Sequence, residues 1–198
     1  MVRGALTKLA EQGLAKAEPQ AGFRVTPLSR ADLIDLFTTR VEVESLTVRH
    51  AVHNGDMAWE SSVVAAHHTL QRTAQLVAGE GSAPNEQWPD AHHAFHRALI
   101  SGCGRPRLCE IAESLWNASE LYRRWATVVQ HERDVPSEHS AILSAVLARD
   151  ADLAAAGLAS HIRMTMKTLL DGFPASRNPA EEPGRRFSTS SPIPQRQR

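Results

Sequence analysis

Residues 88–102 read WPDAHHAFHRALISG, and this stretch decides how the rest of the chain is interpreted. His92 and His96 are four residues apart. On an α-helix this spacing places two side chains on one face, one turn above the other. The pair predicts either a solvated pair on the surface or half of a metal site, so the remaining histidines must decide between them.

Helical patterns continue on both sides of this stretch. Asn54-Gly55-Asp56 breaks the first pattern, glycines end the second, and Ser137 is the expected N-cap of the fifth. The expected helices cover residues 29–52, 56–81, 85–104, 105–129, 135–150 and 150–173. The predicted fold class is therefore all-α, an antiparallel bundle of about six helices over residues 29–173.

The two ends of the chain differ from the bundle. Val2–Leu14 has a helical pattern, and the turn residues Pro19–Gly22 that follow predict a small β-hairpin, so residues 1–28 form a separate piece. Residues 174–198 are rich in Pro, Ser, Arg and Glu with little apolar content, which predicts a disordered tail.

Composition and charge exclude several classes of protein. The chain has 198 residues, 42% of them hydrophobic, which is enough for one core, and its formal net charge is zero. Residues 1–30 nevertheless hold five Lys or Arg against two Glu, which suggests an anionic partner at that end. No apolar run approaches a membrane span and no signal peptide is recognisable, so a cytoplasmic protein without a membrane partner is expected.

Two further histidines extend the opening pair to a set of four. His139 lies early in its helix, and His161 lies on the last helix, both beside positions expected to face the core. Imidazoles from three helices could form a site for a divalent metal ion such as zinc, nickel, copper or iron. The alternative is that His139 caps a helix and His161 hydrogen-bonds a neighbour.

The same residues give no good catalytic interpretation. A metal hydrolase needs a carboxylate base beside the metal-bound water, and no HExxH motif is present. Glu138 directly precedes His139 and is expected to point elsewhere, and neither a Gly-rich phosphate loop nor GxSxG occurs. The chain is therefore not expected to be an enzyme, and a metal-dependent enzyme stays the least favoured alternative.

The spacing HHAFHRALISG, then EHSAILSAVLARDADLAAAGLASHI, resembles the ligand- and metal-binding FCD domain of GntR-type bacterial transcription regulators, in the FadR branch. The resemblance covers roughly residues 29–173. It implies that His96, His139 and His161 ligate a divalent metal together with position 92, where the family has Asp and this chain has His. An all-histidine set favours zinc or nickel over magnesium or manganese.

The resemblance also implies an effector, a small organic acid bound beside the metal. Arg40 matches an arginine that is common in the family, and Asn117 and Arg123 lie on a helix expected to line the cavity. The alternative for Arg40 is a surface ion pair with Glu44, four residues later.

Residues 1–28 resemble the second half of the family's winged helix-turn-helix domain, with Val2–Leu14 as recognition helix and residues 15–26 as the wing. This implies that a homodimer, most commonly a repressor, binds a double-stranded DNA operator through Arg3, Lys8 and Arg24. The first helices of such a domain are absent from the sequence. Either they are encoded upstream of a start assigned too late, or the chain is a truncated effector-binding and dimerisation module without DNA binding.

Overall fold

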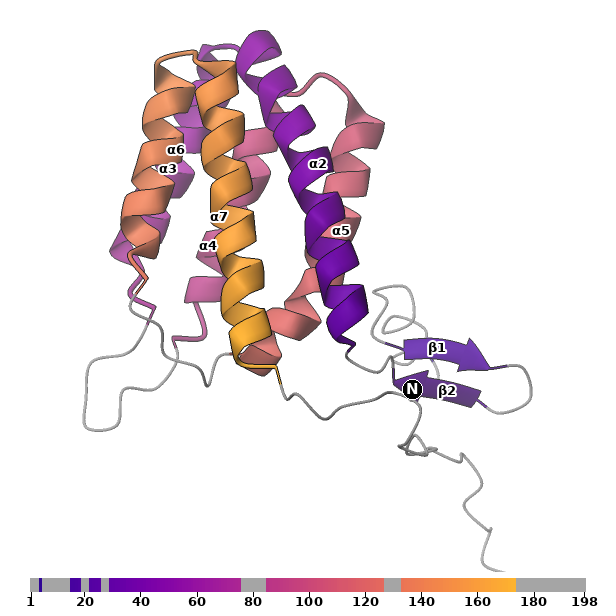
Figure 1. Cartoon of the computed structure of the whole chain (residues 1–198). Helices are drawn as coiled ribbons and strands as arrows, with labels where there is room; N and C mark the ends of the chain where they lie inside the picture. The colour runs from indigo at the N-terminus through magenta and orange to yellow at the C-terminus, as the bar shows by residue number, and fades with distance from the viewer. Residues whose placement is uncertain are drawn as a thin grey trace, which may run out of the picture. The chain divides into compact units, whose positions relative to one another are not determined.

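The computed structural model describes residues 4, 15–18, 22–25, 29–75, 85–126 and 133–173, and in these ranges it confirms the all-α bundle (Figure 1). The helices are α2 (Arg30–Asn54), α3 (Met57–Arg72), α4 (Trp88–Ser101), α5 (Pro106–Ala126), α6 (Val135–Leu147) and α7 (Ala151–Asp171). Each lies within one of the residue ranges expected from the sequence, except that α2 continues two residues beyond its range, to Asn54. The largest shift is in α3, which ends at Arg72, before the glycines expected to stop it.

The most extensive contact between two helices joins α2 and α7, the first and last helices of the bundle, which lie side by side along it (Figure 1). Helix α7 also packs against α6, α2 packs against α5 and α4, and α3 packs against α4 and α6. Fully buried apolar side chains fill the space between them, including Phe37, Phe95, Leu99, Val146 and Leu158. Burying a side chain of this size stabilises the fold by about 1.5–3 kcal/mol, so α4, which carries Phe95 and Leu99, is fixed in the core.

Three acidic N-caps set where helices begin. The Asp56 carboxylate accepts from the Trp59 amide, and the Asp150 carboxylate accepts from the Leu153 amide. The expected N-cap of α6, Ser137, is wrong: the cap is Asp134, whose Oδ1 accepts from the Ser137 amide at 3.1 Å. The helix begins at Val135, and the proline in its first turn is compatible with this start because its missing N–H costs nothing there.

A two-stranded antiparallel hairpin precedes the bundle, as predicted. Strand β1 (Ala15–Glu18) pairs with β2 (Gly22–Val25), with Ala15 opposite Val25. Gly22 has a φ of 93°, which a residue with a side chain rarely adopts. The hairpin and the bundle, Arg30–Pro174, are separate compact units.

Parts of the predicted organisation fall outside the described residues. Of the expected helix Val2–Leu14 only Gly4 is described, in helical conformation, and residues 174–198 are not described. Within the described ranges, each helix is either too short or too polar to cross a bilayer.

Gly55 directly follows α2, at a position where no side chain fits. A Cβ added at Gly55 would lie 2.1 Å from a ring carbon of buried Trp59 and 2.6 Å from the Ala51 carbonyl oxygen. We expect Gly55→Ala to destabilise the protein by about 1–3 kcal/mol, as overpacking does, which lowers Tm by roughly 2–4 °C per kcal/mol for a chain of this size.

The matched control is the same replacement at Gly157, inside α7. There the nearest neighbour of an added Cβ is Cγ1 of buried Ile142, at 3.2 Å, a tight contact but much milder than the 2.1 Å approach at Gly55, and alanine has the higher helix propensity. Thermal unfolding followed by circular dichroism should show a larger fall in Tm for Gly55→Ala than for Gly157→Ala. Equal Tm values for the two variants would contradict this account of the α2–α3 turn.

Candidate metal centre

The structure brings the four predicted histidines together in the middle of the bundle. His92 and His96 come from α4, His139 from α6 and His161 from α7. One ring nitrogen from each lies within 4.8 Å of those of the other three. All four residues are at most 6% exposed. We call these four residues the histidine cluster.

Several nitrogens of the histidine cluster are buried without a hydrogen-bond partner among the described residues. They are Nε2 of His92, both ring nitrogens of His96 and Nε2 of His139. An unsatisfied buried polar atom costs about 1–3 kcal/mol, so a purely structural cluster would not collect four of them. A bound cation would engage Nε2 of His92, Nε2 of His139 and one ring nitrogen of His96, because each residue offers one ligand atom. A set of imidazole nitrogens suits zinc, nickel or copper.

Burial keeps the cluster in its uncharged form. Burial is the main cause that lowers the pKa of His92 and of His96 well below 6.5, followed by the positive Arg123 for His92 and by His92 itself for His96. The pKa of His139 falls to about 3, mainly by burial and then through His161. Burial also lowers the pKa of His161, although its hydrogen bond to Glu138 opposes the shift. Neutral imidazole is the form that ligates a metal.

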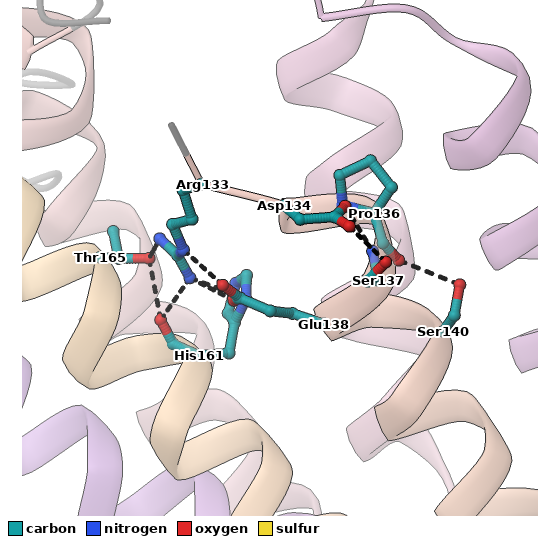
Figure 2. A network of polar contacts seen from close by, with 8 residues as sticks. All are labelled: Arg133, Asp134, Pro136, Ser137, Glu138, Ser140, His161 and Thr165. Carbon is teal, nitrogen blue, oxygen red and sulfur yellow. Dashed lines mark hydrogen bonds and ion pairs between the residues drawn. The ribbon is translucent and has the colours of Figure 1, made fainter. Parts of the chain in front are cut away.

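Glu138 does not point elsewhere, contrary to the expectation from the sequence. Its Oε2 lies 2.8 Å from Nδ1 of His161, and Arg133 bonds both of its oxygens (Figure 2). Burial raises the pKa of the Glu138 carboxyl, but the hydrogen bonds from Arg133 and His161 outweigh it and lower that pKa to about 2. Glu138 is therefore a carboxylate that supports the histidine cluster from outside.

Aromatic rings surround the cluster and keep water away from it. Trp88 stacks on His92 with ring centroids 4.5 Å apart, and Phe95 meets His139 edge-on at 5.2 Å. Trp116, on α5, lies 4.6 Å from the His96 ring. Charge interactions are stronger in such an apolar surrounding than in water.

Two arginines also contact Trp116. The guanidinium carbon of Arg123 is 3.7 Å from the Trp116 ring centroid, and that of Arg40 is 4.9 Å from it. Burial is the main cause that lowers the pKa of Arg123 to about 10, and the nearby charge of Arg40 adds to it. Arg123 pairs with Glu120 of its own helix. Two cationic groups thus contact the same Trp116 ring that packs on His96, and the charge of Arg123 contributes to the lowered pKa of His92.

The ion pair proposed as an alternative for Arg40 exists, but it is buried and not on the surface. Arg40 Nε donates to Glu44 at 2.6 Å, and Nη1 donates to the Ser119 hydroxyl at 3.0 Å. Arg40 is 1% exposed. Asn117 is exposed on α5 and is not brought to the cluster.

The residues expected to contact DNA are not positioned here. Arg3 and Lys8 lie outside the described residues, and Arg24 lies on β2 with its side chain undescribed.

A surface hollow of about 640 Å³ where α4 meets α5 includes Arg97, Arg105 and Cys109, and none of the four histidines lines it.

Comparison with known proteins gives relatives along most of the chain. The FCD domain family matches residues 35–164. The chain is 34% identical to the uncharacterized HTH-type transcriptional regulator BphR of Paraburkholderia xenovorans (strain LB400), over 85% of this chain and 69% of that protein. It is 31% identical to the HTH-type transcriptional repressor GlaR of Escherichia coli (strain K12), over 81% of this chain and 74% of that protein.

A solved structure shows the same fold. The chain superimposes on E. coli McbR/YncC with a TM-score of 0.71 and 21% identity, covering 86% of this chain and 84% of that one. At this identity the likeness supports the fold alone.

Proposed function

The chain belongs to the FCD-domain family of GntR-type transcription regulators, and we propose that its helical bundle senses a small organic acid through a divalent metal held by the histidine cluster. The family consists of regulators and not of enzymes. The observation that carries the proposal is the convergence of four neutral, buried imidazoles, several of whose nitrogens have no partner among the described residues.

Zinc or nickel is the metal we propose for this donor set. Four nitrogens without a carboxylate among them carry no negative charge, so the hard oxygen-seeking cations magnesium and manganese gain little here. When bound, the metal supplies a Lewis-acidic position at which an anionic oxygen of the effector can bind.

The two arginines beside Trp116 are the residues we propose for the remainder of the effector. Arg40 is already committed to Glu44 and Ser119, whereas Nη2 of Arg123, although paired with Glu120, makes no well-oriented hydrogen bond within the described part of the chain. A guanidinium binds a carboxylate through charge-assisted hydrogen bonds. Arg123 is therefore the stronger candidate, and exposed Asn117 the weakest.

For the rest of the molecule we propose a cytoplasmic homodimer that contacts operator DNA through residues 1–28, with Arg3, Lys8 and Arg24 on bases or phosphates, and that acts as a repressor. The names of the relatives support a DNA-binding regulator, and GlaR is named a repressor. The alternative is an effector-binding module without DNA contact. A mobility-shift titration at several salt concentrations separates the two, because phosphate contacts make affinity fall steeply with salt.

The proposed effector site is tested by asking whether acids bind only to the metal-loaded protein. Zinc-loaded and metal-free protein are titrated with a set of small mono- and dicarboxylic acids, and Tm is recorded. We expect at least one acid to raise Tm of the loaded protein alone, by mass action. Acids that leave Tm unchanged in both forms, or raise it equally, would contradict the proposal.

Arg123→Met tests the role of the guanidinium in the same titration. Loss of a charge-assisted hydrogen bond costs about 1.5–3 kcal/mol, so we expect the acid to bind roughly 10- to 150-fold more weakly while zinc content is unchanged. Arg49→Met is the matched control, because Arg49 pairs with Asp152 on the exposed side of the bundle. Equal acid affinities for the two variants would remove Arg123 from the site.

A further inference from the structure

A carboxylate–guanidinium network touches one edge of the histidine cluster (Figure 2). Arg133 Nε donates to Glu138 Oε1 at 2.7 Å, and Arg133 Nη2 donates to Glu138 Oε2 at 2.5 Å. The same Oε2 lies 2.8 Å from Nδ1 of His161. A two-point contact of this kind fixes the plane of a carboxylate, so the Glu138 oxygen that meets His161 cannot rotate away.

Arg133 itself is anchored to α7. Its Nη2 also donates to the backbone oxygen of His161 at 2.9 Å, and its Nη1 donates to Thr165 Oγ1 at 2.9 Å. The Thr165 hydroxyl in turn donates to that same backbone oxygen at 3.0 Å. The guanidinium therefore ties the residues just before α6 to the segment of α7 that carries the ligand.

Hydrogen-bond chemistry decides where the proton of the His161 ring lies. An ionised carboxylate only accepts, so a contact to Glu138 requires that Nδ1 carries the proton. Arg133 Nη2 is also 3.2 Å from Nδ1, but a guanidinium only donates and cannot bond a protonated nitrogen. The carboxylate contact is the shorter one, and Nη2 has two other acceptors, Glu138 and the His161 backbone oxygen. With the proton on Nδ1, the His161 ring donates to Glu138, and Arg133 Nη2 donates to Glu138 and to the His161 backbone oxygen. Only the longer contact between Nη2 and Nδ1 is then not a hydrogen bond.

We propose that Glu138, held in place by Arg133, is a positioning residue that fixes His161 in its Nδ1–H tautomer and leaves Nε2 as the lone pair available for a metal. The consequence for metal binding rests on the proposed function of the histidine cluster. In the described ranges, His161 is the one member of the cluster that pairs with a carboxylate. An outer partner of this kind fixes ring orientation and raises the basicity of the ligating nitrogen.

The test replaces the charged acceptor by a neutral one of the same shape. In Glu138→Gln the amide can present either its oxygen or its NH₂ group to Nδ1, so the tautomer is no longer fixed. The matched control is Glu60→Gln, because Glu60 forms a comparable half-buried pair with Arg149, at 2.8 Å, away from the histidines. Circular dichroism establishes that both variants fold, and Arg133→Lys, which removes the two-point contact but keeps the charge, is the second variant.

Two measurements separate the proposal from the metal centre on which it rests. In metal-free protein labelled with ¹⁵N-histidine, long-range ¹H–¹⁵N spectra report the tautomer directly. We expect Nδ1–H for His161 in the unmodified protein and in Glu60→Gln, and a mixture or the opposite tautomer in Glu138→Gln. In zinc titrations we expect Glu138→Gln to bind roughly 10- to 100-fold more weakly than Glu60→Gln.

The outcomes are distinct. An Nε2–H tautomer in the unmodified protein, or an unchanged tautomer in both Glu138→Gln and Arg133→Lys, overturns the proposal. Zinc affinities for Glu138→Gln and Glu60→Gln that agree within twofold also overturn it. If no form of the protein binds metal while the tautomer still responds to Glu138, the positioning role stands and the proposed metal centre fails.

Discussion

His96→Ala is expected to abolish stoichiometric zinc or nickel binding, the largest effect of any single replacement in the bundle. His96 is 4% exposed, and both of its ring nitrogens lack a partner among the described residues. Removal of a direct ligand should weaken binding by more than the roughly 10- to 100-fold that loss of an outer partner costs. Elemental analysis after dialysis, with a zinc titration, measures both quantities.

The control for His96→Ala is His93→Ala on the same helix. His93 stacks on Trp116 at 5.0 Å but does not belong to the cluster, so metal content should stay at the level of the unmodified protein. The change in Tm, compared between metal-free and zinc-loaded protein, provides a second readout for His96→Ala. In the metal-free state the alanine removes two unsatisfied buried nitrogens, which offsets part of the lost ring packing, so Tm should fall much less than in zinc-loaded protein. Unchanged metal content in His96→Ala would refute the centre.

Periodicity in the sequence was sufficient to predict the six helices, and it made the meeting of the four histidines one of two alternatives, which the family resemblance then favoured. His92 and His96 are one turn apart, and His139 and His161 adjoin apolar positions that must face the core. A helix that buries one face has little freedom to rotate, so ligands placed on that face converge. The same reasoning gave a surface ion pair with Glu44 as the alternative for Arg40. It could not predict that the pair is buried, because Trp116 and Ser119, which cover Arg40, come from α5.

The support around His161 could not be predicted from spacing. Adjacent residues on a helix diverge by about 100°, which is why Glu138 was expected to point away from a site reached by His139. A glutamate side chain is long enough to reach back across the groove to α7, and its direction depends on Arg133. Arg133 precedes α6, where no periodic pattern applies. The sequence did contain one signal for this support: Glu138 adjoins His139, and Arg133 lies five residues before Glu138.

The metal-free protein is expected to lose stability steeply below pH 6.5, because the histidine cluster stays neutral when folded. The pKa of each cluster histidine is lowered in the folded state, that of His139 to about 3, whereas in the unfolded chain all four return to about 6.5. Unfolding below pH 6.5 therefore takes up protons. The stability contribution is complete above the unfolded pKa and is lost as pH falls toward the folded values.

Linkage gives the size of this effect. Each proton taken up on unfolding changes the free energy of unfolding by about 1.4 kcal/mol per pH unit. His92, His96 and His139, whose pKa values fall furthest, therefore give a slope of up to about 4 kcal/mol per pH unit between about pH 6 and pH 5, and His161 adds to it. Domains of this kind are stable by only about 5–15 kcal/mol, so urea unfolding at a series of pH values should show the free energy of unfolding of the metal-free protein falling steeply toward pH 5. The lowered pKa of Glu138, about 2, acts in the same direction but only below about pH 4.5.

His139→Gln measures the contribution of one histidine to the pH dependence of the free energy of unfolding. Glutamine keeps a polar side chain in the cluster and does not titrate. We expect the slope between pH 6 and pH 5 to fall by about 1.4 kcal/mol per pH unit, while the same replacement at exposed His68 serves as the control. Bound zinc should steepen the acid transition, since protons compete with the metal for the same nitrogens. A metal-free protein whose free energy of unfolding is flat from pH 7 to pH 5 would mean that these imidazoles are charged or exposed, and the neutral, buried cluster on which metal binding depends would be wrong.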